Sequence, residues 1–129
     1  MKAIGIIVAF FGVVAFTKFY LAPPTSGDGR QVITNYVRQC SEGNMRLADF
    51  HQTAGREYIL GGVRIYVMAF EGTVECTTDD PAKDGLQVEF AFDRTNNDQV
   101  PAMRAGERRI VRGAIQFEKT TYAWVGQPM

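Results

Sequence analysis

The chain has few of the residues that most enzymes use for chemistry, with one histidine and two cysteines in 129 residues. Two distant cysteines and a lone histidine do not form the paired spacing of a zinc site, so neither a metal nor a cofactor is predicted. Positive charge is not in excess either, because 14 Lys and Arg balance 14 Asp and Glu. Nucleic-acid binding requires a concentrated basic surface, and no nucleic-acid partner is predicted.

Charge is scarcest near the N-terminus, where residues 3–22 carry only Lys18. About 20 apolar residues cross a bilayer as a helix. Lys18 near its end can extend its stem to the headgroups, and Tyr20 is a typical interfacial residue. We therefore predict a transmembrane signal-anchor helix over residues 1–22. The alternatives are a cleaved secretion signal, for which Tyr20 before Ala22 and Pro23 makes a poor cleavage site, and a buried helix of a soluble protein.

The rest of the chain is long enough for one domain only. Residues 23–29 are proline, glycine and small polar residues and predict a linker, followed by an α+β domain over residues 30–126 and a tail over residues 127–129. A helix is expected first, capped by Ser26 or Asp28 and ended by Gly43. Its apolar stripe has helical spacing and consists of Val32, Ile33, Tyr36, Val37 and Cys40.

After Gly43 the apolar period changes to two, which is typical of strands. Strands are expected at about 45–53, 63–77, 86–93, 108–119 and 122–125. One helix packed on a curved antiparallel sheet of four to five strands would bury all of these apolar faces.

The C-terminal part carries a specific pattern, with Gly106-Glu107, Gly113, Phe117-Glu118-Lys119-Thr120 and Trp124. In this pattern the chain resembles small, uncharacterised bacterial envelope domains of cystatin-like or nuclear-transport-factor-like shape. It departs from them at Tyr122-Ala123, where glycine usually precedes the tryptophan. The resemblance implies one helix on a bent sheet, often tethered by a single membrane helix, and implies no catalytic residues.

Lys2 and the terminal amine favour an inside N-terminus, although Lys18 and Arg30 on the other flank reduce this bias. The expected location is the bacterial cytoplasmic (inner) membrane, with a single pass and the domain on the periplasmic or extracellular side. In that oxidising compartment Cys40 and Cys76 are either a disulfide or two buried free thiols, and the sequence leaves both open.

Four arginines form the densest basic cluster: Arg104, Arg108, Arg109 and Arg112. With Lys18 and Tyr20, they are the predicted contacts to lipid headgroups or to an acidic partner surface. The alternative is an edge strand that uses charge to prevent unwanted pairing.

The remaining polar candidates are weaker. His51 near Asp49 could act as a base, but no nucleophile motif accompanies it, and an exposed strand histidine is predicted. Three glutamates recur at strand spacing, namely Glu71, Glu75 and Glu89. Such a set could supply the acid and base of a glycosidase, but a solvated sheet face explains it better. Gly61-Gly62 predicts a turn or bulge.

Nine aromatic residues either form the core, which is favoured, or line a ligand pocket on the concave side of the sheet. They are Phe50, Tyr58, Tyr66, Phe70, Phe90, Phe92, Phe117, Tyr122 and Trp124.

The expected function is therefore that of a non-catalytic, membrane-anchored accessory subunit of a larger integral membrane complex, such as an energy-transducing respiratory or photosynthetic assembly. One alternative is a stand-alone envelope module that binds a ligand on the concave face. The other is a small isomerase-like or hydrolase-like enzyme, which would need a buried acid or base that the sequence does not reveal. No small-molecule substrate is identified.

Overall fold

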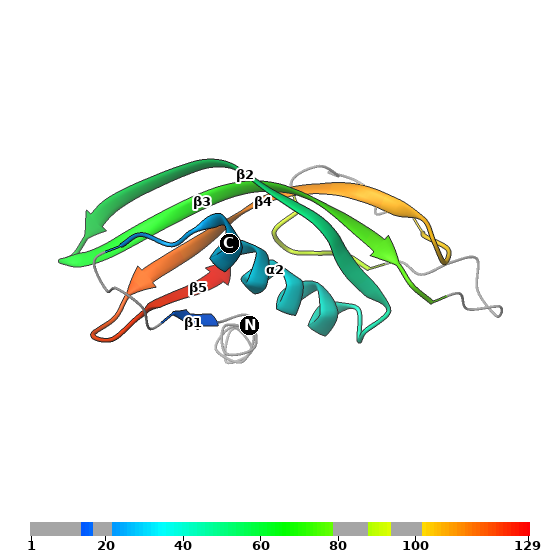
Figure 1. Ribbon diagram of the computed structural model, residues 1–129, viewed down its shortest axis with the longest axis horizontal. Helices are drawn as coiled ribbons and strands as arrows, with labels where there is room; N and C mark the ends of the chain where they lie inside the picture. The colour runs from blue at the N-terminus through cyan, green and yellow to red at the C-terminus, as the bar shows by residue number, and fades with distance from the viewer. Residues whose placement is uncertain (1–13, 17–21, 79–87, 94–101) are drawn as a thin grey trace.

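The computed structural model describes residues 14–16, 22–78, 88–93 and 102–129, and every statement below concerns these residues. A single helix lies along the concave side of a strongly curved antiparallel sheet (Figure 1). This confirms the α+β prediction. The elements in chain order are β1 (Val14–Phe16), α2 (Ser26–Cys40), β2 (Met45–Leu60), β3 (Val63–Cys76), β4 (Arg108–Lys119) and β5 (Trp124–Pro128).

Helix α2 begins with a capping box. The Asp28 N–H donates to Thr25 Oγ1 (3.3 Å), and the Thr25 N–H donates to a carboxylate oxygen of Asp28 (2.8 Å). The cap is therefore Thr25 and not Ser26 or Asp28, and α2 begins inside the segment predicted as a linker. At the other end the Gly43 N–H donates to Arg38 O (2.9 Å), with Gly43 in the left-handed conformation expected after a helix.

The sheet has the strand order β1-β5-β4-β3-β2, and all neighbours are antiparallel. Strands β2 and β3 form a long hairpin closed by the pair Leu60↔Val63. Gly61 and Gly62 both have positive φ (60° and 82°), as a type I′ hairpin turn requires. Two register shifts in β2, after Leu47 and after Gln52, fit the curvature of the sheet, since bulges bend a strand.

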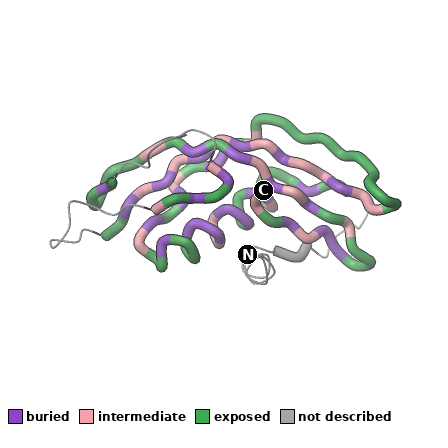
Figure 2. Tube along the Cα trace, turned by 180° about the vertical axis from the view of Figure 1, so that it is seen from behind, coloured by how far each residue is buried: buried purple, intermediate pink, exposed green. Residues whose placement is uncertain are grey.

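The core lies between α2 and the concave face of the sheet, and buried residues recur along both α2 and the strands (Figure 2). Four residues of the predicted helical stripe are buried there, whereas the fifth, Cys40, is exposed. The sheet contributes alternate residues, as its period of two requires, except between Leu47 and Phe50, where a register shift interrupts the alternation. These are mainly Met45, Leu47, Phe50, Met68, Phe70, Val74, Val111, Ile115, Phe117 and Trp124.

One predicted strand is wrong in its described part. Residues 88–93 are irregular and turn at 91–92, and they form no strand. Phe90 and Phe92 are nevertheless buried, because this segment lies across the inner face of β4 at Gly113, where a Cβ would come within 2.6 Å of Phe92 O. The alternation in sequence thus reflects packing onto the sheet and not pairing within it.

The ends of the domain also differ from expectation. Strand β5 reaches Pro128, which pairs with Ile115, so the sheet includes most of the predicted tail. Most of the predicted anchor, including Lys18 and Tyr20, lies outside the described residues. Within the described part of the chain, no helix is both long enough and apolar enough to span a membrane. Val14–Phe16 pair as β1 with the outer edge of β5.

Candidate functional site

The predicted arginine cluster is divided between the two faces of β4. Arg108 and Arg112 are exposed, and each pairs with a glutamate of β3: Arg112 Nη2 lies 2.7 Å from Glu71, and Arg108 Nη2 lies 3.6 Å from Glu75. Arg46 of β2 also contacts Glu75 (2.6 Å). This face therefore carries a cross-strand ladder of mixed charge rather than a basic patch.

Arg109 points to the opposite face, where its side chain is only 9% exposed. Its Nη2 lies 3.6 Å from Asp93 Oδ2 and donates to Val88 O (3.2 Å), and its guanidinium stacks over the Phe90 ring. Burial lowers the pKa of Arg109, and the carboxylate of Asp93 opposes this shift. Arg109 thus holds the segment 88–93 to the sheet and does not face a partner. Arg104 belongs to the turn before β4, where its N–H donates to Glu107.

The two cysteines are free in the structure, so the disulfide alternative is not realised there. Cys40 is exposed at the last residue of α2, whereas Cys76 is fully buried at the end of β3, with its thiol directed at Thr78 O (3.2 Å). Although the residue is exposed, its thiol is partly desolvated by its surroundings, which raises the pKa of Cys40, the opposite of what a reactive thiolate needs.

His51 is exposed on β2, as predicted, and is paired in register with Glu71. Both glutamates of β3 are engaged by arginines, and Glu89 lies outside the sheet in the irregular segment. The structure does not bring these carboxylates together as an acid and a base. In the described ranges, no group of three or more His, Cys, Asp or Glu side chains could hold a metal ion.

The aromatic residues are mostly core. Six of them are between 0% and 8% exposed and pack on one another or on α2: Phe50, Phe70, Phe90, Phe92, Phe117 and Trp124. Phe50 and Phe70 stack with ring centroids 5.2 Å apart, and Tyr36 of α2 meets the Phe92 ring edge-on at 5.4 Å. The described part of the concave face is therefore filled by side chains. Tyr58 and Tyr122, in contrast, are exposed.

These exposed aromatics lie at one end of the sheet. Strand β3 begins at Val63, directly after the Gly61-Gly62 turn. The last residues of β4 pair with this first part of β3, and the turn at 120–123 follows β4. Both turns consequently lie at the same end of the long axis (Figures 1 and 2). We name this the turn end; it comprises residues 58–63 and 120–123.

The turn end also receives the chain as it enters the domain. Trp124 Nε1–H donates to Ala22 O (2.7 Å), a bond between residues 102 positions apart. Above the Trp124 ring lies the Arg64 guanidinium, 5.3 Å from the ring centroid, and Arg64 is in turn paired with Glu57. Ala22, the last residue of the predicted anchor, is thereby fixed close to the β2–β3 turn.

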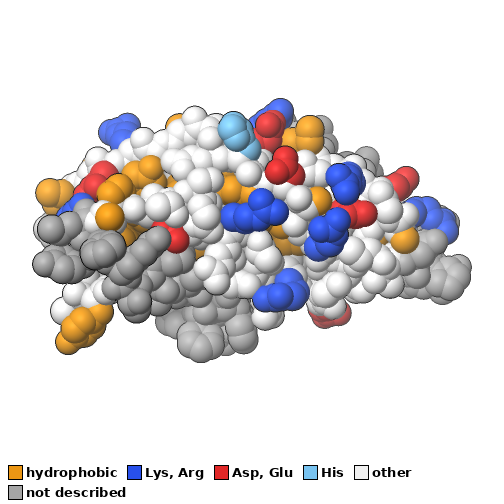
Figure 3. Space-filling model, viewed as in Figure 1, with side chains coloured by type: hydrophobic (Ala, Val, Ile, Leu, Met, Phe, Trp, Pro, Cys, Tyr) orange, Lys and Arg blue, Asp and Glu red, His pale blue; other side chains and the backbone are white. Residues whose placement is uncertain are grey.

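The turn end is rich in exposed apolar side chains. Of the six large hydrophobic residues exposed in the described part of the chain, four lie there, namely Tyr58, Ile59, Leu60 and Tyr122. Ile59 (69% exposed) and Leu60 (65%) directly precede the turn and point to opposite faces of the hairpin. The space-filling view shows hydrophobic side chains at the surface of this end (Figure 3, left).

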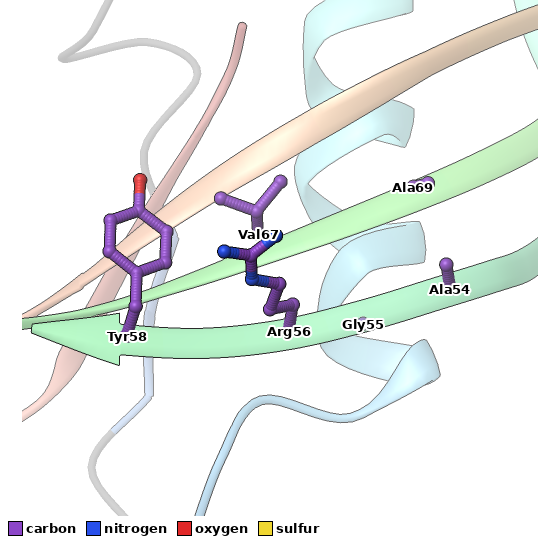
Figure 4. Close-up of a pocket in the computed structure, with 6 residues that line it drawn as sticks. All are labelled: Ala54, Gly55, Arg56, Tyr58, Val67 and Ala69. Carbon is purple, nitrogen blue, oxygen red and sulfur yellow. The ribbon is translucent and has the colours of Figure 1, made fainter.

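A shallow depression of about 540 Å³ adjoins the turn end on the outer face of β2 and β3. Arg56, Tyr58 and Val67 stand on the same side of the two strands and form most of its wall (Figure 4). Its other lining residues are Ala54, Gly55 and Ala69. Among its described lining residues Arg56 is the one charged group, and none is a carboxylate, a histidine or a cysteine.

Sequence reasoning missed the turn end. The signal was present, since two aliphatic residues directly before Gly61-Gly62 in an alternating strand place apolar side chains at a hairpin tip.

Comparisons with protein-family models, with curated proteins and with solved structures found no match to this chain. The resemblance to envelope domains therefore stays a prediction.

Proposed function

We propose that the protein is a non-catalytic accessory subunit of a larger integral membrane complex, anchored by residues 3–22 and contacting its partners through the anchor and the α+β domain. The observation that carries this proposal is the hydrogen bond from Trp124 to Ala22 O. A free tether would leave the domain mobile at the membrane. This contact fixes the domain to the last residue of the anchor and gives a partner one defined surface to bind.

The anchor requires Val14–Phe16 to be helical within the membrane, whereas these residues form β1 in the structure. Strand β1 is a three-residue edge strand, and β5 is held on its other side by five pairs with β4. In this proposal the membrane form releases β1, and the rest of the sheet is retained. The location on the periplasmic or extracellular side, with the N-terminus inside, belongs to the same proposal.

The alternative functions receive less support. A stand-alone envelope module that binds a ligand on the concave face needs open space there, and the described part of that face is filled by α2 and aromatic side chains. An isomerase-like or hydrolase-like enzyme needs a placed acid or base. The buried ion pair of Arg109 with Asp93 serves to pack a loop segment instead.

The first test is the state of the native protein. We expect the mature chain to start at Met1, to resist alkaline extraction from membranes, and to co-migrate with much larger proteins in mild detergent. A mature start near Pro23, or migration as a free small protein, would contradict the proposal.

The second test concerns the junction. Trp124→Phe keeps an aromatic ring beneath Arg64 and removes the N–H that Ala22 accepts. We expect this variant to remain in the membrane but to show a smaller fraction in the large complex. Tyr66→Phe is the matched control, since it also removes one hydrogen bond, from Gln52 (3.1 Å), without touching Ala22. Equal complex fractions for the two variants would count against a role of the junction.

A further inference from the structure

We infer that the turn end is a membrane-contacting surface: the β2–β3 turn and the β4–β5 turn meet the lipid headgroup layer of the same bilayer that holds the anchor. This inference rests on the proposed function and extends it, because it fixes which end of the domain faces the lipid. The sequence predicted lipid contacts elsewhere, at Lys18, Tyr20, Arg104, Arg108, Arg109 and Arg112, and none of these residues belongs to either turn.

Ala22 lies next to both turns. A helix that ends at Ala22 leaves the bilayer there, and Ala22 is hydrogen-bonded to Trp124, the first residue after the β4–β5 turn. Arg64, two residues after Gly62, lies over the same tryptophan ring. Both turns are therefore next to the point at which the chain emerges from the membrane.

Both turns carry exposed apolar side chains. The hairpin tip presents Ile59 and Leu60 on its two faces, so no rotation of the hairpin hides both from the medium. Tyr122, in the other turn, is 82% exposed. The aliphatic side chains at the tip suit the acyl-chain boundary of the bilayer. The tyrosines suit the headgroup layer, where tyrosine is enriched.

The charged side chains of the outer face also suit this orientation. Arg56 lies over the Tyr58 ring at 6.0 Å, and its guanidinium is on the outer face of the hairpin, behind the tip. An arginine just behind the hairpin tip can pair with lipid phosphates while its aliphatic stem covers the apolar surface. The mixed-charge ladder of Glu71, Glu75 and their arginines lies further along the sheet, away from the turns. It would remain in water in this orientation.

The test measures the depth of single labelled sites in the full chain, reconstituted without partners into phosphatidylethanolamine and phosphatidylglycerol vesicles. An environment-sensitive fluorophore is attached to Leu60→Cys in a Cys40→Ser background, in which Cys76 is shielded by full burial. His51→Cys is the matched control, exposed on the same strand about 30 Å from the tip. A label at Tyr122→Cys examines the second turn independently.

We expect blue-shifted emission and several-fold stronger quenching by nitroxide-bearing lipids at positions 60 and 122 than at position 51. If the chain resists alkaline extraction but position 60 is no more quenched than position 51, the inference that the turn end contacts the membrane is wrong. The proposed anchor is then retained. Equal quenching at all three positions would overturn the end-on orientation. A chain that is extracted at alkaline pH would remove the proposed function and this inference together.

Discussion

Tyr36 and Cys40 lie one turn apart on α2, and their interaction makes a residue-level prediction about alkaline stability. Burial, with a smaller contribution from Cys40, raises the pKa of Tyr36 to about 12 from its ordinary value of 10. In the unfolded chain the phenol loses its proton near pH 10, while in the folded chain it keeps the proton to about pH 12. The free energy of unfolding should therefore fall as pH rises between these values, by up to about 1.4 kcal/mol per pH unit.

The measurement is urea unfolding of the full chain in detergent, followed by Trp124 fluorescence at several alkaline pH values. Cys40→Ser is introduced into both chains so that the thiol does not contribute. We expect Tyr36→Phe to lose the additional fall in stability above pH 10, because it carries no titratable group there. Parallel stability curves for the two chains would show that Tyr36 titrates normally.

Only part of the candidate site could be predicted, residue by residue, from the sequence. The burial of Phe117 followed from strand alternation. Strict alternation from Met45 and Leu47 would place His51 on the inner face, and the register shift after Leu47 turns it outward. The same alternation should have separated Arg109 from Arg108, because neighbouring residues of a strand face opposite sides. Reading the arginines as one cluster by their closeness in sequence ignored that rule. The partner Asp93 was beyond prediction, since it comes from a segment with no strand of its own.

At the scale of elements, the packing of segment 88–93 on β4 depends on Gly113. A Cβ at this position would lie 2.6 Å from Phe92 O and 2.7 Å from Phe92 Cδ1, so the segment would have to move away from the sheet. We expect Gly113→Ala to lower the free energy of unfolding by about 1–3 kcal/mol, as overpacking does.

Gly27→Ala provides the control in the same assay. Its Cβ would meet nothing closer than Thr25 Oγ1 at 3.8 Å, and alanine favours the first turn of α2. We expect a gain of roughly 0.5–1 kcal/mol from the lower conformational freedom of the unfolded chain. A small effect of Gly113→Ala, similar in size to that of Gly27→Ala, would mean that Phe92 does not pack against β4 as described.

The elements themselves were largely predictable, because α2, β2, β3 and β4 each carry a clear apolar period. Segment 88–93 was misassigned for a physical reason: residues two apart can be buried together in a turn that crosses a sheet as well as in a strand. Strand β5 was expected to end at 125, but it continues to Pro128 because the edge of β4 needs a partner up to Ile115.

For the whole molecule, the central question is the competition for Val14–Phe16. As β1 they pair with β5, where Ala15 lies opposite Val125. As part of a membrane helix they satisfy their backbone internally, since the bilayer core offers no other hydrogen-bond partners. The same three residues cannot do both, so the outer edge of β5 reports which state exists.

Hydrogen exchange read by mass spectrometry distinguishes the two states. In the full chain embedded in a bilayer, we expect β5 to exchange part of its amides rapidly, because the amides that face β1 lose their acceptors while those that face β4 remain bonded. Strand β3, paired on both sides, serves as the internal reference and should stay protected. If β5 is as protected as β3 in the bilayer, then β1 persists there. Residues 3–22 could then not form a continuous transmembrane helix, and the anchor would have to be abandoned.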